Sequence, residues 1–299
     1  MLLMTGARTA PRQGSEAGRS TVATTNPAGK PHRRSRRGPE LLLRLALVTL
    51  LLLVTAAVIW VVRIATVPAS AADAPADSVQ PAAVDPDSAA PVEAAGAVPP
   101  AGQGHQGVQN GPEALRPWAE RLGRTTGIPA RALMAYGNAE LAVRTDSPRC
   151  GLSWATLAAI GRVESDHGRF GDATLGADGR PSVPIIGVPL DGSEGVRAIG
   201  DTDGGRYDGD ATVDRAVGPM QFIPSTWRTW TSDGNGDGVG DPQQIDDAAF
   251  AAARYLCADG RDMTSAKGWW QGVFSYNNSV AYGQKVYGLA DHYARAAAG

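Results

Sequence analysis

The 299-residue sequence is poor in aromatic residues outside its C-terminal part. Of its 18 Phe, Trp and Tyr residues, 17 lie in 113–299, and the other is Trp60. A hydrophobic core needs large apolar side chains, so only the last 187 residues can build one, and two full-length domains are excluded. The sequence also lacks a βαβ alternation, a glycine-rich phosphate loop and an internal repeat. A single, mainly helical domain is what these absences leave.

Charge is distributed unevenly along the chain. Residues 1–63 carry 10 Lys and Arg against two acids, whereas 64–112 carry five acids and no base. Residues 113–299 carry 18 bases and 23 acids, so their net charge is −5. Because binding to nucleic acid phosphates needs a net positive surface, we expect no nucleic acid partner for this part of the chain.

A membrane span is predicted near the N-terminus. Residues 45–62 contain no charge, and with the leucines just upstream they give an apolar segment at 41–62. A helix of this length spans about 33 Å, roughly one hydrocarbon core. The sequence therefore predicts one transmembrane anchor that attaches the protein to the cytoplasmic membrane.

The flanking residues set the orientation of this span. Residues 1–40 have no aromatic and no apolar period, and they end in a basic cluster at 30–37, so they are expected to be a disordered cytoplasmic tail. A short A-x-A-like site at 69–71 leaves secretion after signal cleavage as the alternative. Either way, 113–299 is exported.

The segment between the span and the domain is expected to be a linker. Residues 68–112 hold eight Pro and thirteen Ala with no aromatic residue, a composition typical of a semi-rigid extended chain. We interpret 63–112 as a disordered spacer without a binding role.

The only two cysteines, Cys150 and Cys257, both lie in the exported part. An isolated pair in an oxidising compartment most simply forms one disulfide, and neither cysteine has a recognisable cysteine-enzyme motif around it. We therefore predict the Cys150–Cys257 bridge.

Helical patterns dominate the domain. Residues 166–215 differ, with eleven Gly and nine Asp and a single apolar island at 183–190, which predicts a long loop with room for a short β-hairpin. The predicted helices are 113–123, 129–143, 152–165, 224–230, 246–258, 265–275 and 280–297.

Glu164 is placed unusually at the end of the third predicted helix. Its spacing from Leu157 and Ile160 puts it on the same face as these apolar side chains. A carboxyl group on a buried face has a raised pKa, as a general acid near neutral pH requires. Taken alone, such a residue is more often a surface Glu at a frayed helix end.

Two further segments favour a catalytic role for Glu164 over a surface position. Residues 215–227 read RAVGPMQFIPSTW, and Tyr276-Asn277 precedes the last predicted helix. Together with Glu164-Ser165, in this order, they resemble lytic transglycosylases, specifically the membrane-bound lytic transglycosylase B type of actinobacteria. The resemblance covers about 113–299 and implies a lysozyme-like helical fold with a helix-terminal Glu facing a saccharide groove. It also implies cleavage of the MurNAc–GlcNAc bond of peptidoglycan glycan strands, leaving a 1,6-anhydro end, without an organic cofactor.

The resemblance also implies roles for individual residues. Glu164 would be the sole acid and base, and Asp166 is assigned no catalytic role because a helix would point it about 200° away. For Phe222 and Tyr282 a place in the core is equally open. The substrate-binding or supporting residues would be Ser165, Met220, Gln221, Phe222, Tyr276, Asn277 and Tyr282. Two alternatives stay open: a hydrolysing muramidase that adds an Asp from 201–214, and a non-catalytic wall-binding scaffold.

A structural calcium site is predicted in 233–247. Asp233, Asn235 and Asp237 occupy positions 1, 3 and 5 of an EF-hand-like loop, and Val239 would offer its backbone carbonyl at position 7. The usual Glu at position 12 is missing, so Asp247 is the preferred closing ligand, with Asp246 as the alternate. A metal-free Asp/Asn/Gly turn would have the same composition.

Overall fold

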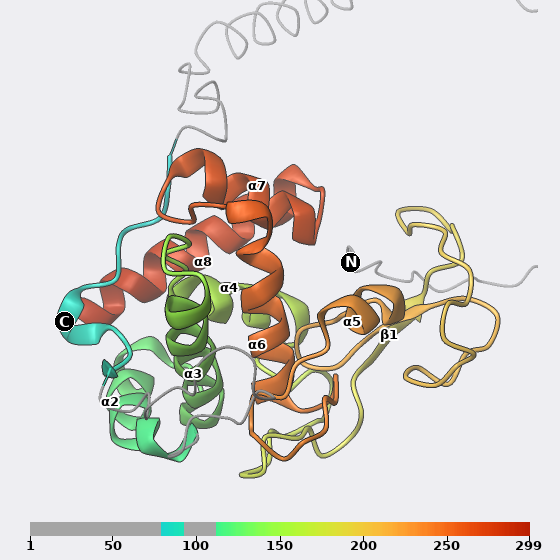
Figure 1. Cartoon of the computed structure of the whole chain (residues 1–299). Coiled ribbons are helices and arrows are strands. Elements are labelled where there is room, and N and C mark those ends of the chain that lie inside the picture. Colours follow the sequence, from blue (N-terminus) through green and yellow to red (C-terminus); the bar gives the residue numbers. More distant parts are fainter. Residues whose placement is uncertain (1–78, 93–111) are drawn as a thin grey trace, which may run out of the picture. The chain divides into compact units, whose positions relative to one another are not determined.

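The structure, a computed structural model, describes residues 79–92 and 112–299, which lie in one compact unit (Figure 1). The predicted cytoplasmic tail at 1–40 and the predicted membrane span at 41–62 lie outside the described residues. Among the helices that the structure describes, none has the length and apolar character needed to cross a membrane.

The described part of the chain is mainly helical, and the predicted helices are confirmed to within a few residues. At two of the boundaries the N-cap residue is clear: Pro129 precedes α3, and the Gln244 side chain caps α6 by accepting from the Asp246 and Asp247 N–H groups. The helices are α2 (Arg116–Thr126), α3 (Ala130–Asp146), α4 (Trp154–Ser165), α5 (Pro224–Trp230), α6 (Ile245–Leu256), α7 (Ala266–Tyr276) and α8 (Val280–Ala298), with 3₁₀ turns η1 (Pro86–Ser88), η3 (Pro112–Leu115) and η4 (Ala258–Gly260).

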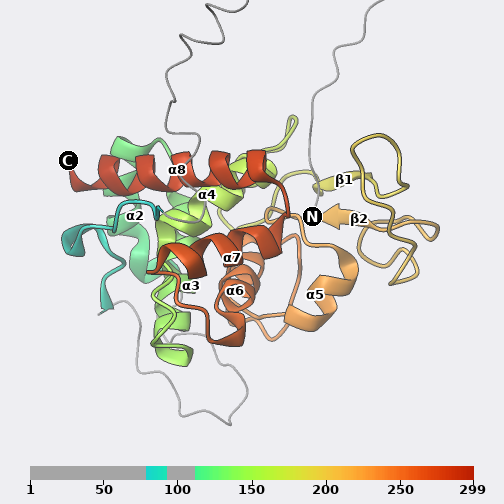
Figure 2. The same ribbon diagram turned by 90° about the horizontal axis from the view of Figure 1, so that it is seen from above.

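The core forms where α3, α4, α6 and α8 meet. In Figure 1, α3 and α6 run side by side, and Figure 2 shows α8 lying across α4. Small residues let α3 and α6 approach closely: Ala132, Ala135 and Ala139 of α3 are buried, and so are five alanines of α6. Helix α4 is buried on almost every side, which matters because it ends in Glu164-Ser165.

A two-stranded antiparallel sheet joins the long loop to the rest of the domain. Strand β1 (Ile186–Pro189) pairs with β2 (Arg215–Val217), with Ile186 opposite Val217. The sequence predicted a short hairpin within 166–215, and this prediction is partly wrong. The apolar island does form a strand, but its partner begins only at Arg215, the last residue of that loop. Next to the two strands, the Leu190 N–H donates to the Asp214 carbonyl at 3.0 Å.

Residues 79–92 are folded onto the domain, which corrects their interpretation as part of a spacer without binding role. The backbone carbonyl of Ser88 accepts hydrogen bonds from the indole N–H groups of Trp118 at 3.2 Å and Trp154 at 3.1 Å. The indole of Trp270 donates to the Val79 carbonyl at 2.8 Å, and Ala90 is only 2% exposed. Composition could not reveal this docking, because the segment contributes backbone carbonyls and the domain contributes the large side chains.

The predicted disulfide between Cys150 and Cys257 is confirmed. It ties the residues just before α4 to the C-terminal end of α6, 107 positions further along the chain. In the chain-entropy model a loop of this length contributes about 4–5 kcal/mol to the free energy of unfolding. The bridge therefore fixes the start of the helix that carries Glu164.

Deleting residues 79–92 should destabilise the domain. We expect a melting temperature several degrees lower, because the Trp118 and Trp154 indoles lose their acceptor, at a cost of roughly 1–3 kcal/mol. Ala90→Arg should reproduce part of this loss, since the position is buried. Calorimetry on the two variants and the parent measures the effect. Equal melting temperatures for all three would show that the segment is a mere spacer.

Candidate active site

Glu164 lies in the last turn of α4 and is only 5% exposed. Its Oε1 accepts a 2.6 Å hydrogen bond from the Tyr282 hydroxyl of α8. Burial raises the pKa of Glu164 to about 8, while the bond from Tyr282 opposes this by favouring the carboxylate. The carboxyl group is therefore protonated at neutral pH and can donate its proton.

The chain turns sharply directly after Glu164. Asp166 (φ 52°) and His167 (φ 60°) both have left-handed backbone conformations, which non-glycine residues adopt rarely. The His167 N–H closes the helix end by donating to the Gly161 carbonyl at 2.9 Å. The Asp166 carboxylate pairs with Arg162 and Arg169. Asp166 therefore has ion-pair partners of its own, and its lack of a catalytic role stays a prediction.

The predicted G-P-M-Q-F motif forms a tight turn between β2 and α5. Val217 and Phe222 exchange backbone hydrogen bonds at 2.8 and 3.0 Å, which leaves 218–221 as the turn. Gly218 is required there: its φ is +77°, and a Cβ would lie 1.7 Å from the Pro242 carbonyl oxygen. Gln221 also has a positive φ, of 48°. Strained backbone of this kind is concentrated at functional sites.

This turn is held by both of the other motifs. The Ser165 hydroxyl, next to Glu164, donates to the Pro219 carbonyl at 2.6 Å. The Tyr276 hydroxyl donates to the Met220 carbonyl at 2.9 Å. The three segments that are far apart in the sequence thus meet around Glu164. The hydroxyls of Ser165 and Tyr276 thus position the turn, while the predicted contacts of these two residues with substrate stay a prediction.

The remaining predicted substrate residues lie at different depths. Met220 is fully buried, and Phe222 makes edge-to-face contacts with Trp227 and Tyr276, so both belong largely to the core. The Gln221 amide donates to the Gly218 carbonyl at 3.0 Å, while its Oε1 has no hydrogen-bond partner. A buried acceptor without a partner is costly, which marks Gln221 as a candidate for ligand contact.

A cleft of about 310 Å³ lies beside this cluster. Asn277 lines it, is only 6% exposed, and has an amide Nδ2 without a hydrogen-bond partner. Tyr276 lines the same cleft, and the charge of Glu164 contributes, after burial, to raising the Tyr276 pKa, so the two side chains are close. The full lining comprises Gly195, Arg197, Phe222, Ile223, Thr226, Tyr255, Phe274, Ser275, Tyr276, Asn277 and Asn278.

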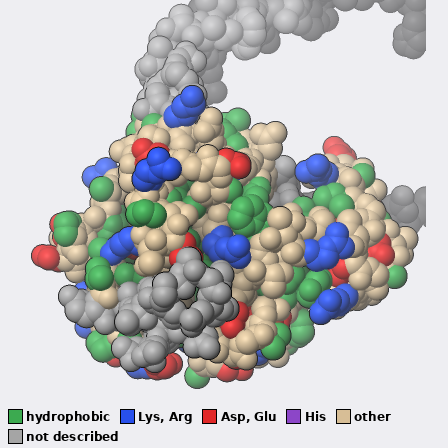
Figure 3. All heavy atoms as spheres, viewed as in Figure 1, with side chains coloured by type: hydrophobic (Ala, Val, Ile, Leu, Met, Phe, Trp, Pro, Cys, Tyr) green, Lys and Arg blue, Asp and Glu red, His purple; other side chains and the backbone are tan. Residues whose placement is uncertain are grey.

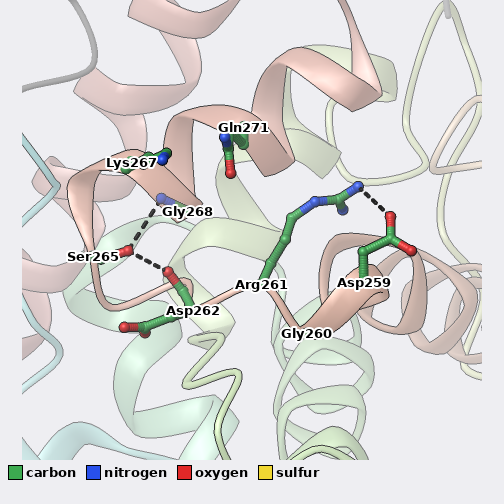
Figure 4. Close-up of a pocket in the computed structure, with 8 residues that line it drawn as sticks. All are labelled: Asp259, Gly260, Arg261, Asp262, Ser265, Lys267, Gly268 and Gln271. Atoms are coloured by element: carbon green, nitrogen blue, oxygen red, sulfur yellow. Dashed lines mark hydrogen bonds and ion pairs between the residues drawn. The ribbon is translucent and has the colours of Figure 1, made fainter.

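A second, shallower depression of about 450 Å³ lies at the start of α7 (Figure 4). Its polar groups serve local structure: Ser265 caps α7 by accepting from the Gly268 N–H at 3.1 Å and donates to the Asp262 carbonyl at 2.8 Å. Arg261 pairs with Asp259 at 3.6 Å. None of the predicted site residues lines it, and we assign it no function.

Sequence reasoning missed several polar residues that hold the start of α4 and the chain just after its end. The hydroxyl of Tyr136 lies 3.1 Å from Nδ1 of His167, and burial lowers the pKa of this histidine to about 3, so the ring is neutral. Glu140 accepts the Trp154 N–H at 2.7 Å and thereby caps the start of α4. These contacts join residues 14 to 31 positions apart, and no local pattern signals them.

The predicted calcium loop is ordered by its own side chains. Asp233 accepts the backbone N–H groups of Gly236 and Gly238 at 2.7 and 2.8 Å. Asp247 is fully buried and accepts the Gly234 N–H at 2.8 Å, whereas Asp246 pairs with Arg131. The ion pair argues against Asp246 as a ligand. The donor chemistry of Asp233, Asn235, Asp237, the Val239 carbonyl and Asp247 suits calcium, although every one of these carboxylates bonds to loop N–H groups.

Among the described residues, a different acidic trio comes closest together. Ligand atoms of Asp201, Asp203 and Asp214 lie within 4.8 Å of one another. These three carboxylates accept hydrogen bonds from backbone N–H groups of the same loop, for example Asp214 from Thr202 at 2.8 Å. The trio is thus part of what orders the long loop.

Comparison with known families supports the assignment of the domain. Residues 208–273 match the model of the family described as "Transglycosylase SLT domain". The match covers the turn at 218–221 and helices α5 and α6, while Glu164 lies before it. No curated protein matches the sequence. The family match makes the protein an enzyme, a peptidoglycan lytic transglycosylase, and the mainly helical architecture fits a lysozyme-like domain.

The raised pKa of Glu164 predicts a pH-dependent stability difference. Its folded-state pKa of about 8 exceeds the ordinary value of 4.5 for a Glu side chain, so the folded protein binds an extra proton between these pH values. Its contribution to stability therefore declines as pH rises through this window. Glu164→Gln cannot ionise, so the melting temperature of the variant minus that of the parent should grow with pH until about 8. Calorimetric scans across the window test this, and a constant difference would refute the buried, protonated state.

Proposed function

We propose that the protein is a membrane-bound lytic transglycosylase of the B type, in which Glu164 is the sole acid and base. The observation that carries the proposal is the burial of Glu164 at the end of α4, with Tyr282 as the hydrogen-bond donor to its carboxyl group and with the neighbouring Ser165 bonded to the turn at 218–221. A carboxyl group that is protonated at neutral pH is what the first step of glycosidic bond cleavage requires.

The proposed reaction needs one carboxyl group used twice. Glu164 donates its proton to the oxygen that joins C1 of MurNAc to GlcNAc, and the C1–O bond breaks. The resulting carboxylate then takes the proton of the C6 hydroxyl of the same MurNAc, whose oxygen attacks C1. The products are a free GlcNAc hydroxyl and a 1,6-anhydro-MurNAc end, and no water is consumed. Tyr282 stabilises the carboxylate between the two steps, because its hydroxyl donates to Oε1.

The surroundings of Glu164 favour this route over hydrolysis by two carboxylates. Retaining and inverting glycosidases place a second carboxylate at roughly 5–9.5 Å from the first. The nearest acid in sequence, Asp166, is engaged by two arginines. In the loop at 201–214, Asp210 pairs with Arg215, and Asp208 accepts the Arg215 N–H at 2.7 Å. These acids are committed to local structure, which supports Glu164 acting alone.

Glu164→Gln should abolish turnover while keeping the fold. The amide is isosteric and cannot donate the proton, so we expect a loss of roughly 10²–10⁴-fold or more on murein sacculi. Glu120→Gln, an exposed change on α2, is the matched control and should retain parent activity.

Mass spectrometry of the parent's products decides between the reactions. Anhydro ends are lighter than reducing ends by one water. If only reducing ends were found, the enzyme would be a hydrolysing muramidase and not a transglycosylase. Binding to sacculi without release of product would favour a non-catalytic scaffold. Activity of Glu164→Gln within a few-fold of the parent would remove this residue from the mechanism.

The predicted export supports the choice of substrate. We propose that the segment at 41–62 anchors the enzyme, with the catalytic domain on the outer side of the cytoplasmic membrane, where peptidoglycan lies. Cleavage near 69–71 would instead release it as a secreted enzyme. The Cys150–Cys257 bridge agrees with either oxidising location.

We also propose that the loop at 233–247 binds calcium in a structural role. Asp233, Asn235 and Asp237 at alternate positions offer hard oxygen donors, and Asp247 lies against the same loop through its bond to Gly234. Bound calcium would hold this loop between the turn at 218–221 and α6, with no part in bond cleavage.

Millimolar calcium should raise the melting temperature of the protein relative to EDTA. An occupied site at 100 times its Kd contributes about 2.7 kcal/mol. Asp233→Asn should lose most of this response, whereas Asp201→Asn, in the other acidic cluster, should keep it. No heat of binding in calorimetric titration, or a response lost only in Asp201→Asn, would contradict the assignment.

A further inference from the structure

The cleft that Tyr276 and Asn277 line has a distinctive charge. Of its eleven lining residues, Arg197 is the only Asp, Glu, Lys or Arg. Arg197 lies in the loop between β1 and β2 and is exposed. Within the part of the chain that the structure describes, its side chain makes neither an ion pair nor a hydrogen bond. On the face that Figure 3 shows, Lys and Arg side chains are scattered and acidic side chains lie between them.

The same cleft contains a polar group that lacks a partner. The amide Nδ2 of Asn277 is buried and makes no hydrogen bond, so it is available to an acceptor entering the cleft. Tyr255 and Phe274 add aromatic surface to the walls. Apolar ring surface, an unsatisfied donor and one cation together suit a sugar that carries an acyl carbonyl and a negative charge.

Peptidoglycan supplies such a group only on its muramoyl residues. The sugar rings of the glycan strand are neutral, as they are in a chitin oligomer made of GlcNAc alone. Each MurNAc, however, carries a lactyl arm that ends either in a free carboxylate or in a stem peptide with its own carboxylates. The charge complementary to Arg197 is therefore found on this arm and nowhere else on the strand.

We propose that Arg197 binds a carboxylate of the muramoyl arm and so makes the cleft selective for peptidoglycan strands over neutral glycans. This assignment rests on the proposed function, because it takes the cleft to be part of the substrate groove. A guanidinium group suits the role, since it is always charged and can bind both carboxylate oxygens at once. Its exposed position on a loop implies a moderate effect that weakens as salt increases.

The test measures binding in the absence of turnover. The full chain carrying Glu164→Gln is titrated with three glycans of matched length: peptide-free GlcNAc–MurNAc strands, peptide-bearing strands, and chitin oligomers. Arg197→Gln is then added to this chain. Arg149→Gln is the matched control, because Arg149 is also exposed, makes no ion pair among the described residues, and does not line the cleft.

Arg197→Gln should weaken binding of muramoyl strands about tenfold or more, leave chitin oligomers unchanged, and remove most of the salt dependence. If Arg197→Gln binds both strand types more weakly, the contact is with the carboxylate at the position that both share, which is the lactyl carboxylate or that of the first peptide residue. Loss with peptide-bearing strands alone assigns it to the stem peptide, and loss with peptide-free strands alone to the free lactyl carboxylate.

Two results would overturn the proposal. One is unchanged affinity for every muramoyl strand in Arg197→Gln, and the other is an equal loss with chitin oligomers or in Arg149→Gln. Failure of the proposed function is recognised separately, because the parent protein would then release no product from sacculi, whatever residue 197 is.

Discussion

The turn at 218–221 is the constraint on which the site depends. Its Pro219 and Met220 carbonyls accept hydrogen bonds from Ser165 and Tyr276, which are the last residues of α4 and α7. Gly218 lies so close to the Pro242 carbonyl that any side chain at this position would push the turn away from the loop that leads into α6. Displacing this turn would therefore disturb the end of α4, the end of α7 and the start of α6 together.

Burial of Glu164 lowers the stability of the domain and raises the pKa of the carboxyl group, as a general acid requires. Helix α4 is apolar around almost its whole circumference, and a charged carboxylate at its end would be costly. The protein meets this cost by keeping the group protonated at neutral pH, and it supplies one donor, Tyr282, for the moment when the group ionises. A more polar environment would stabilise the domain at neutral pH and above but would lower the pKa of the acid.

The long loop at 166–215 and the segment at 79–92 have different roles in the domain. The long loop is ordered by its own aspartates, which accept backbone N–H groups, and it presents Arg197 to the cleft from outside. The segment at 79–92 has a different role: its Ser88 carbonyl accepts hydrogen bonds from the indoles of Trp118 and Trp154 on the core helices. Exposed connections thus carry binding groups, whereas this part of the linker stabilises the scaffold.

The sequence by itself determined the helices, the disulfide partners and the three motifs around Glu164. Helical periodicity and caps are local, and two cysteines allow only one intramolecular pair. It could not determine that Ser165 and Tyr276 face the turn, that Tyr282 bonds to Glu164, or that 79–92 docks on tryptophans. These contacts join residues 30 to 191 positions apart. Only tertiary packing decides them, because a side chain's partner depends on which helices meet and how deeply each is buried.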